Sequence, residues 1–368
     1  MPLPLRVALV AACCVVIWSA DRLRSTDDTY LGLGPGPVGV AADPDGASVY
    51  VAQFNAREVW QLDTTSGAVG ARVPIPDLEP KYGLVPIALD WSTVLGGPVL
   101  ACHRWGSQLQ LDFDATPPIV HYFEPETGAL PSDTDSGDFD RASLVAYADG
   151  LDGTVVLVMA QVRTMIESVT LVRARRNPYW SIEAVSAPIP VEHGYQRGAW
   201  PLVASTARRT LYLAEPGTGR VFEIGEDLAL RRELLVGRYP FAAALDDASG
   251  RLYLADKKLG AVSSLDLESF SLERQVSVCA GPTSLALDAA DSALWVACQH
   301  DAAVVRLDVP ELTESRRVGA LAEPTALALA PDHQRLWVAE LGRGALVAIG
   351  THDAGAPLTR WPLTGNPP

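Results

Sequence analysis

The stretch that decides the fold is EPTALALAPDHQRLWVAEL, residues 323–341, because it returns in the chain as PTSLALDAADSALWVACQ, residues 282–299. Each copy has a proline, a small apolar alternation, a polar turn and then an aromatic run that ends in Val-Ala. Alternation at a period of two, between segments rich in Gly, Pro and Asp, is typical of β-strands. The repeat therefore predicts paired strands that recur along the chain.

Seven stretches of this kind divide the chain into units. They open near residues 37, 86, 142, 201, 240, 282 and 324, and the copy at 142 lacks its proline. The last four openings lie roughly 40 residues apart, a length that suits four short strands. Four-stranded units repeated seven times bury their faces by packing around an axis, so we predict an all-β, seven-bladed β-propeller as a single domain over residues 21–368. The outer strand of the last blade comes from residues 30–34 or from residues 358–365.

The unit PVGVAADPDGASVYVAQFNAREVWQLDTTSG, residues 37–67, resembles the YVTN-type β-propeller repeats of bacterial exported and surface proteins. The resemblance covers roughly residues 34–363 and is weaker in the second and third units, which carry insertions. It implies a propeller of the lactonase-like superfamily. It does not imply one activity, because such propellers include lactonases, lyases and binding platforms.

Composition narrows the class of partner. The chain has 368 residues, of which 48% are hydrophobic, so it can bury a core. Its 29 Lys and Arg against 44 Asp and Glu give a net charge of -15, which opposes binding to nucleic acid and to anionic lipid. We therefore expect no nucleic-acid partner.

Residues 1–20 have the features of an export signal. An apolar run from Val7 to Trp18 follows one arginine and ends at small residues. A signal peptide is the favoured interpretation, and the alternatives are an uncleaved N-terminal anchor and a lipoprotein lipidated at Cys13. These interpretations place the domain in the periplasm or outside the cell, with membrane contact only through the N-terminal segment.

The residue after the repeated Val-Ala marks one face of the predicted disc, where second strands end and the loops between blades lie. The seven positions are Gln53, Cys102, Gln161, Glu215, Asp256, Cys298 and Glu340. The carboxylates Glu215, Asp256 and Glu340 are candidate ligands for a cation, a polyol or an amine. The alternative is that this position hydrogen-bonds the local turn.

Loops on the same face place tyrosines near cations just before a blade. The candidate ligand-binding residues in these loops are Tyr82, His193, Tyr195, Arg197 and Tyr239. Aromatic rings beside guanidinium groups suit an anionic or sugar-like ligand. The alternative is that these tyrosines pack beneath their loops.

The acidic stretch SDTDSGDFD, residues 132–140, is a candidate metal site. It brings together Asp133, Asp135, Asp138 and Asp140, and closely spaced carboxylates in a loop with a glycine can bind Ca²⁺ through their oxygens. The alternative is a solvated acidic loop. We expect no other cofactor.

Two cysteines of the sixth blade, Cys279 and Cys298, are expected on the same face and are candidates for a disulfide. Cys102 occupies the position of Cys298 in another blade and is expected to be free.

No catalytic motif supports an activity, since the chain has no HExxH, GxSxG, CxxC or glycine-rich phosphate loop. We therefore favour an exported, non-catalytic propeller that binds a small molecule, a glycan or a protein on its loop-rich face. The alternatives are a propeller enzyme of lactonase or lyase type, with His193 or Arg197 beside a carboxylate, and a structural module of an envelope assembly.

Overall fold

The computed structural model describes residues 36–54, 56–75, 85–103, 108–112, 119–123, 142–150, 152–162, 166–177, 179–194, 200–353 and 357–363. In these residues the chain forms seven antiparallel sheets, six of four strands and one of five. The prediction of an all-β fold built from repeated four-stranded units is confirmed. Among the described residues, no helix has the length and apolar character needed to cross a membrane.

The strands follow one another along the chain, sheet by sheet. The first sheet has β1 (Pro37–Ala42), β2 (Ser48–Gln53), β3 (Glu58–Asp63) and β4 (Val69–Pro74). The second has β5 (Val85–Ser92), β6 (Gly97–His103), β7 (Gln108–Asp112) and β8 (Ile119–Phe123). The third has β9 (Ala142–Asp149), β10 (Val155–Val162), β11 (Ile166–Asn177), β12 (Tyr179–Val185) and β13 (Ile189–Gly194).

The last four sheets are the most regular. They comprise β14 (Leu202–Ser205), β15 (Thr210–Ala214), β16 (Arg220–Gly225) and β17 (Leu230–Leu235); β18 (Pro240–Asp246), β19 (Arg251–Asp256), β20 (Ala261–Asp266) and β21 (Ser271–Ser277); β22 (Pro282–Asp288), β23 (Ala293–Cys298), β24 (Ala303–Asp308) and β25 (Thr313–Val318); and β26 (Pro324–Leu329), β27 (Arg335–Glu340), β28 (Ala345–Gly350) and β29 (Thr359–Pro362). A 3-10 turn, η4 (Leu341–Arg343), follows β27.

The third sheet departs from the four-strand pattern at its outer edge. The long strand β11 pairs with β12 through Val172–Asn177 and with β13 through Ile166–Val169. Between these two outer strands, Ser186 exchanges hydrogen bonds with the backbone of Leu171. The outer strand is therefore interrupted rather than lost.

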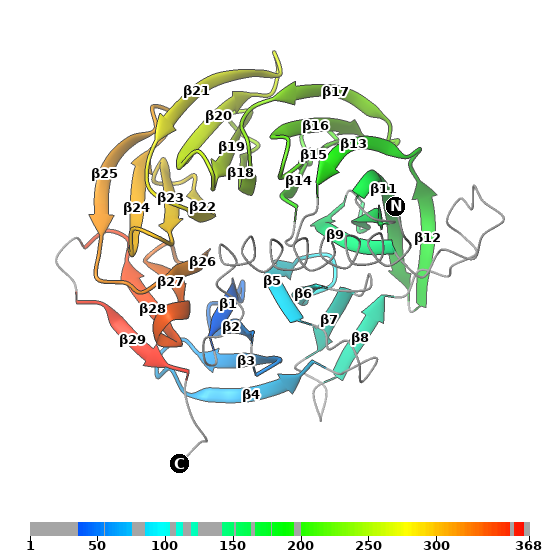
Figure 1. Ribbon diagram of the computed structural model, residues 1–368. Coiled ribbons are helices and arrows are strands. Elements are labelled where there is room, and N and C mark those ends of the chain that lie inside the picture. The colour runs from blue at the N-terminus through cyan, green and yellow to red at the C-terminus, as the bar shows by residue number, and fades with distance from the viewer. Residues whose placement is uncertain are drawn as a thin grey trace, which may run out of the picture. The chain divides into compact units, whose positions relative to one another are not determined.

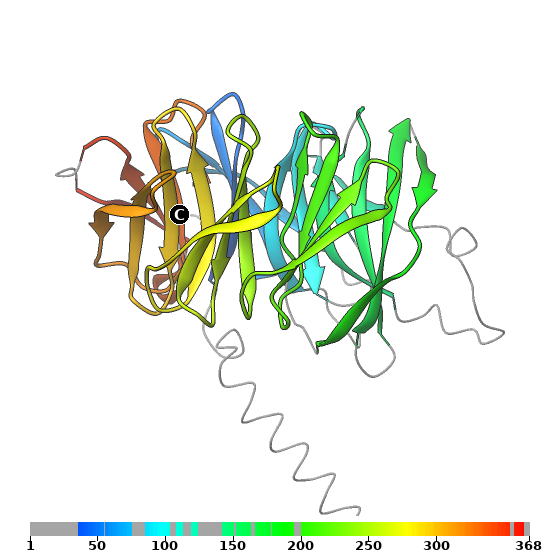
Figure 2. The same cartoon turned by 90° about the horizontal axis from the view of Figure 1, so that it is seen from above.

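The seven sheets are arranged around a common centre, each with its first strand innermost (Figure 1). Figure 2 shows the same sheets edge-on, with the inner strands crossing the thickness of the disc. The last sheet lies beside the first, since the Thr325 hydroxyl donates to the Pro37 carbonyl at 3.1 Å and the Arg335 guanidinium donates to the Thr64 carbonyl at 2.8 Å. The outer strand of the last sheet is β29, whereas residues 30–34 lie outside the described residues.

The hydrophobic core lies between neighbouring sheets. Trp295 of β23 packs with Leu336 and Val338 of β27, and Trp337 of β27 packs with Val51 of β2. All of these side chains are almost fully buried. Each sheet therefore buries both faces against its neighbours, and the inner strands are left to surround the centre.

Candidate functional site

Three second strands end at a carboxylate, as the repeat predicted. These carboxylates are Glu215, Asp256 and Glu340; all three are buried, and each is hydrogen-bonded to loops or turns of its own sheet. Asp256 is 3% exposed and accepts the backbone N–H groups of Tyr239 at 2.8 Å and of Leu259 at 2.8 Å. It also accepts the N–H of Arg238 at 2.5 Å. One carboxylate thus holds the loop that leads into its sheet and the turn that follows β19.

Glu340 holds its neighbourhood in the same way but with more charge. It is fully buried, accepts the N–H of Ala322 at 2.7 Å, and pairs with Arg343 at 2.6 Å and Arg360 at 3.1 Å. Glu215, which is 1% exposed, accepts the Thr218 hydroxyl and the Arg220 guanidinium. Because these oxygens already bind protein groups, the hydrogen bonds observed are those of the turn interpretation. A ligand-binding role for the three carboxylates stays a prediction.

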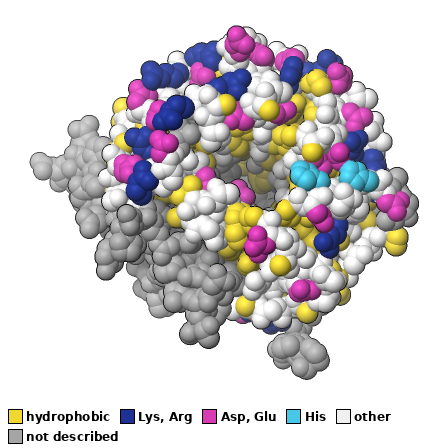
Figure 3. Space-filling model, turned by 180° about the vertical axis from the view of Figure 1, so that it is seen from behind, with side chains coloured by type: hydrophobic (Ala, Val, Ile, Leu, Met, Phe, Trp, Pro, Cys, Tyr) yellow, Lys and Arg dark blue, Asp and Glu magenta, His cyan; other side chains and the backbone are white. Residues whose placement is uncertain are grey.

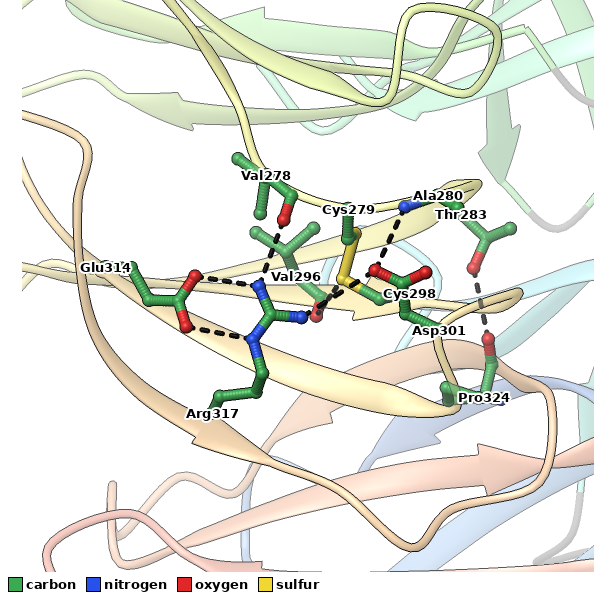
Figure 4. Close-up of a disulfide and its surroundings, with 10 residues drawn as sticks. All are labelled: Val278, Cys279, Ala280, Thr283, Val296, Cys298, Asp301, Glu314, Arg317 and Pro324. Carbon is green, nitrogen blue, oxygen red and sulfur yellow. Dashed lines mark hydrogen bonds and ion pairs between the residues drawn. A yellow bond between two sulfur atoms is a disulfide. The ribbon is translucent and has the colours of Figure 1, made fainter.

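Cys298 occupies the carboxylate position of the sixth sheet and forms a disulfide with Cys279 (Figure 4). The Cα atoms of the two residues lie 5.8 Å apart. Figure 4 also shows Arg317, which donates to the Val278 carbonyl at 3.0 Å and pairs with Glu314 at 2.8 Å. The loop before the sixth sheet is therefore held by a covalent bond where Asp256 and Glu340 use hydrogen bonds.

Tyr239 is the one tyrosine of the predicted loop cluster that the structure describes. Its ring stacks on Phe241 with centroids 6.2 Å apart, and the Lys258 ammonium lies 5.0 Å from the Tyr239 centroid. The Tyr239 ring therefore packs against its own sheet and makes a cation–π contact with Lys258. Its role toward a ligand stays a prediction.

Most of the other predicted site residues lie outside the described part of the chain. Tyr82, Tyr195 and Arg197 lie outside the described residues, as do the candidate calcium ligands Asp133, Asp135, Asp138 and Asp140. His193 lies within β13, and its side chain is not among those that the structure describes. Within the described ranges, no group of three or more His, Cys, Asp or Glu side chains is placed to hold a metal ion.

The inner strands surround a cavity of about 500 Å³ at the centre of the sheets. Its lining comes from β1, β5, β14, β18, β22 and β26 and is mostly alanine, leucine and valine. Figure 3 shows a hollow at this centre, bordered by hydrophobic side chains. The volume is that of a small-molecule site, and the wall is apolar with few polar groups, as such sites are.

Asp90 is the one ionisable side chain in the described lining of this cavity. Its carboxylate is exposed toward the cavity and accepts the backbone N–H of Trp91 at 2.8 Å. Desolvation by the surrounding strands raises the pKa of Asp90 to about 6; the Trp91 N–H opposes this shift, and the charge of Asp149 adds to it. A carboxyl group with a raised pKa thus faces a mostly apolar cavity.

Sequence reasoning missed Asp90, although the repeat contains the signal. The fourth residue after the opening proline is alanine in four sheets, and the residues are Ala41, Ala244, Ala286 and Ala328. In the second sheet the same position is Asp90, and it pairs with Val99 as the alanines pair with Tyr50, Tyr253, Trp295 and Trp337. The acid is an exception within a ring of small residues.

Sheets of this kind, arranged around a common centre, are those of the β-propeller class of proteins. Among solved structures, a streptogramin B lyase is similar at 15% identity and a TM-score of 0.60, over 84% of this chain and 92% of that one. Hydrazine synthase of Kuenenia stuttgartiensis is similar at 12% identity and a TM-score of 0.66, over 86% of this chain and 96% of that one. At such identities the likeness shows the fold alone. No protein-family model matches the sequence, and no curated protein matches it.

Proposed function

We propose that this chain is a closed, seven-bladed propeller that binds a small molecule in its central cavity. The cavity of about 500 Å³, surrounded by inner strands from six described sheets, is the observation that supports this function. Contacts of Thr325 with Pro37 and of Arg335 with Thr64 support closure of the ring without a strand shared between the first and last blades. The protein is a binding protein rather than an enzyme in this proposal, and glycans and proteins are ligands of its outer loops.

A thermal unfolding experiment tests the proposal. The full chain is melted alone and with choline, glucose or γ-butyrolactone, and a ligand present at a hundred times its Kd adds about 2.7 kcal/mol to stability. The variant Ala242→Phe fills the cavity from β18, where Ala242 is half-buried and lines the wall, and it should abolish the shift. The control Ala207→Phe adds the same ring to an exposed turn and should keep it. A shift that persists in Ala242→Phe would place the ligand elsewhere.

A propeller enzyme of lactonase or lyase type is the second candidate, and Asp90 is the observation in its favour. A carboxyl group with a pKa of about 6 is suited to act as a general acid or base near neutral pH. The two structurally similar proteins named above are a lyase and a synthase. Ring opening of γ-butyrolactone that is lost in Asp90→Asn would favour this candidate, and an absence of turnover with bound ligand would favour binding.

Export is the third part of the proposal, and the apolar run from Val7 to Trp18 supports it. The protein is periplasmic or extracellular, of the YVTN type and bacterial, with membrane contact limited to its N-terminal segment. Fractionation of cells that express the full chain tests this, with Cys13→Ser separating a lipid anchor from a cleaved signal. Recovery of the protein in the cytoplasm would contradict export.

A further inference from the structure

We infer that the central cavity is selective for an organic cation, whose ammonium group pairs with Asp90. This inference rests on the proposed function, because it names the class of ligand that the same cavity takes. The position of Asp90 in the repeat is the first argument. Alanine occupies it in four other sheets, so the fold accepts a small apolar side chain there and does not require an acid.

The charge of Asp90 is not balanced by the described protein. Its Oδ1 accepts the Trp91 N–H, and no cationic side chain among the described residues pairs with it. The charge of Asp149 acts on it, and Asp149 is also negative; its oxygens accept the hydroxyls of Ser92 and Thr93. Because Asp90 is exposed within a mostly apolar cavity, its carboxylate is accessible to a charged group of a ligand. A cationic ligand supplies that charge.

The wall of the cavity favours an organic cation over a metal ion. Ca²⁺ takes six to eight oxygen ligands, whereas Asp90 is the one carboxylate of the described lining. The residue next to it, Trp91, also lines the cavity; its ring packs on Tyr50 with centroids 5.7 Å apart and is half-buried, which leaves part of the indole for an ammonium group within about 6 Å. Phe241, elsewhere in the lining, already has the Lys257 ammonium 4.7 Å from its ring centroid. The cation is therefore directed toward Asp90 and Trp91, and the apolar wall receives its carbon substituents.

Choline and its uncharged isostere 3,3-dimethylbutan-1-ol test the inference, because they differ in the charge and not in the shape. Binding to the full chain is measured by titration calorimetry and by tryptophan fluorescence, since Trp91 and Trp200 both line the cavity. We expect choline to bind the wild-type protein about tenfold or more tightly than the isostere, and Asp90→Ala to remove this preference. The repeat itself places alanine at this position, so the variant is expected to fold. The control Asp45→Asn neutralises an exposed turn carboxylate and should leave the preference unchanged.

The outcomes separate this inference from the proposed function. If the isostere binds as tightly as choline and Ala242→Phe blocks both, the cavity is a ligand site but is not selective for cations. Choline that binds Asp90→Ala as tightly as wild type also overturns the inference. If neither probe binds the wild-type protein, the inference fails. The cavity then takes neither a charged nor an uncharged ligand of this size, which also counts against the proposed function.

Discussion

Removal of the Cys279–Cys298 disulfide should destabilise the protein by a predictable amount. The two cysteines are separated by 19 residues, and closing a loop of this length stabilises a fold by about 3 kcal/mol in the chain-entropy model. Cys298 is fully buried among Val262, Val296 and Val305, so we choose alanine rather than serine to keep a hydroxyl out of this cluster. Loss of the buried sulfur adds about 1 kcal/mol.

The assay is guanidinium unfolding of wild type and of the Cys279→Ala, Cys298→Ala double variant, with and without dithiothreitol. Without reductant the double variant should be about 4 kcal/mol less stable than wild type, and with reductant the difference should fall to about 1 kcal/mol. The difference between these two conditions isolates the crosslink from the lost packing. A wild-type stability that does not change with reductant would refute the conclusion that the disulfide does the work of the Asp256 and Glu340 hydrogen bonds.

Two further predictions concern the cavity and the contact between the first and last sheets. The pKa of Asp90 rises from about 3.9 to about 6 on folding, so the free energy of unfolding of the protein falls as the pH increases through that window. Asp149 is the other titratable group that acts on Asp90. Thermal unfolding of Asp90→Asn should therefore show a variant more stable than wild type at pH 8 and equal to it near pH 4; a variant less stable at pH 8 would contradict the desolvation of this carboxylate by the surrounding strands. Gly67 and Gly46 both have φ near +70°, but a Cβ at Gly67 would lie 2.4 Å from the Trp361 ring, whereas a Cβ at Gly46 meets nothing within 4 Å. Gly67→Ala should cost about 1 to 3 kcal/mol more than Gly46→Ala in urea unfolding, and equal costs would argue against this contact between the first and last sheets.

The strands could be predicted because their determinants are local. Residues 324–329 and 335–340 alternate, carry a turn between them and form β26 and β27 as the pattern indicated. The third sheet has no opening proline, yet Ala142–Asp149 still forms its first strand, because the alternation of apolar residues persists. The split outer edge of that sheet was not predicted, since it depends on how far β11 extends beyond its neighbours.

The candidate site could be predicted only in part, for a reason that is also physical. The ends of the second strands follow from the repeat, so Asp256 and Glu340 were expected at these ends, but each has a hydrogen-bond partner 18 residues upstream that the repeat does not indicate. The cavity depends on six inner strands from distant parts of the chain. An acid at the Asp90 position has no significance within one unit, and it becomes informative when the units are aligned on their strand pairing.

The most direct test of the central claim is a crystal structure of the protein grown with choline. The account predicts density for choline inside the cavity between β5 and the other inner strands, with its nitrogen within about 4 Å of the Asp90 carboxylate, near Trp91. Choline bound only on the outer surface, or a centre that neighbouring side chains fill completely, would contradict it.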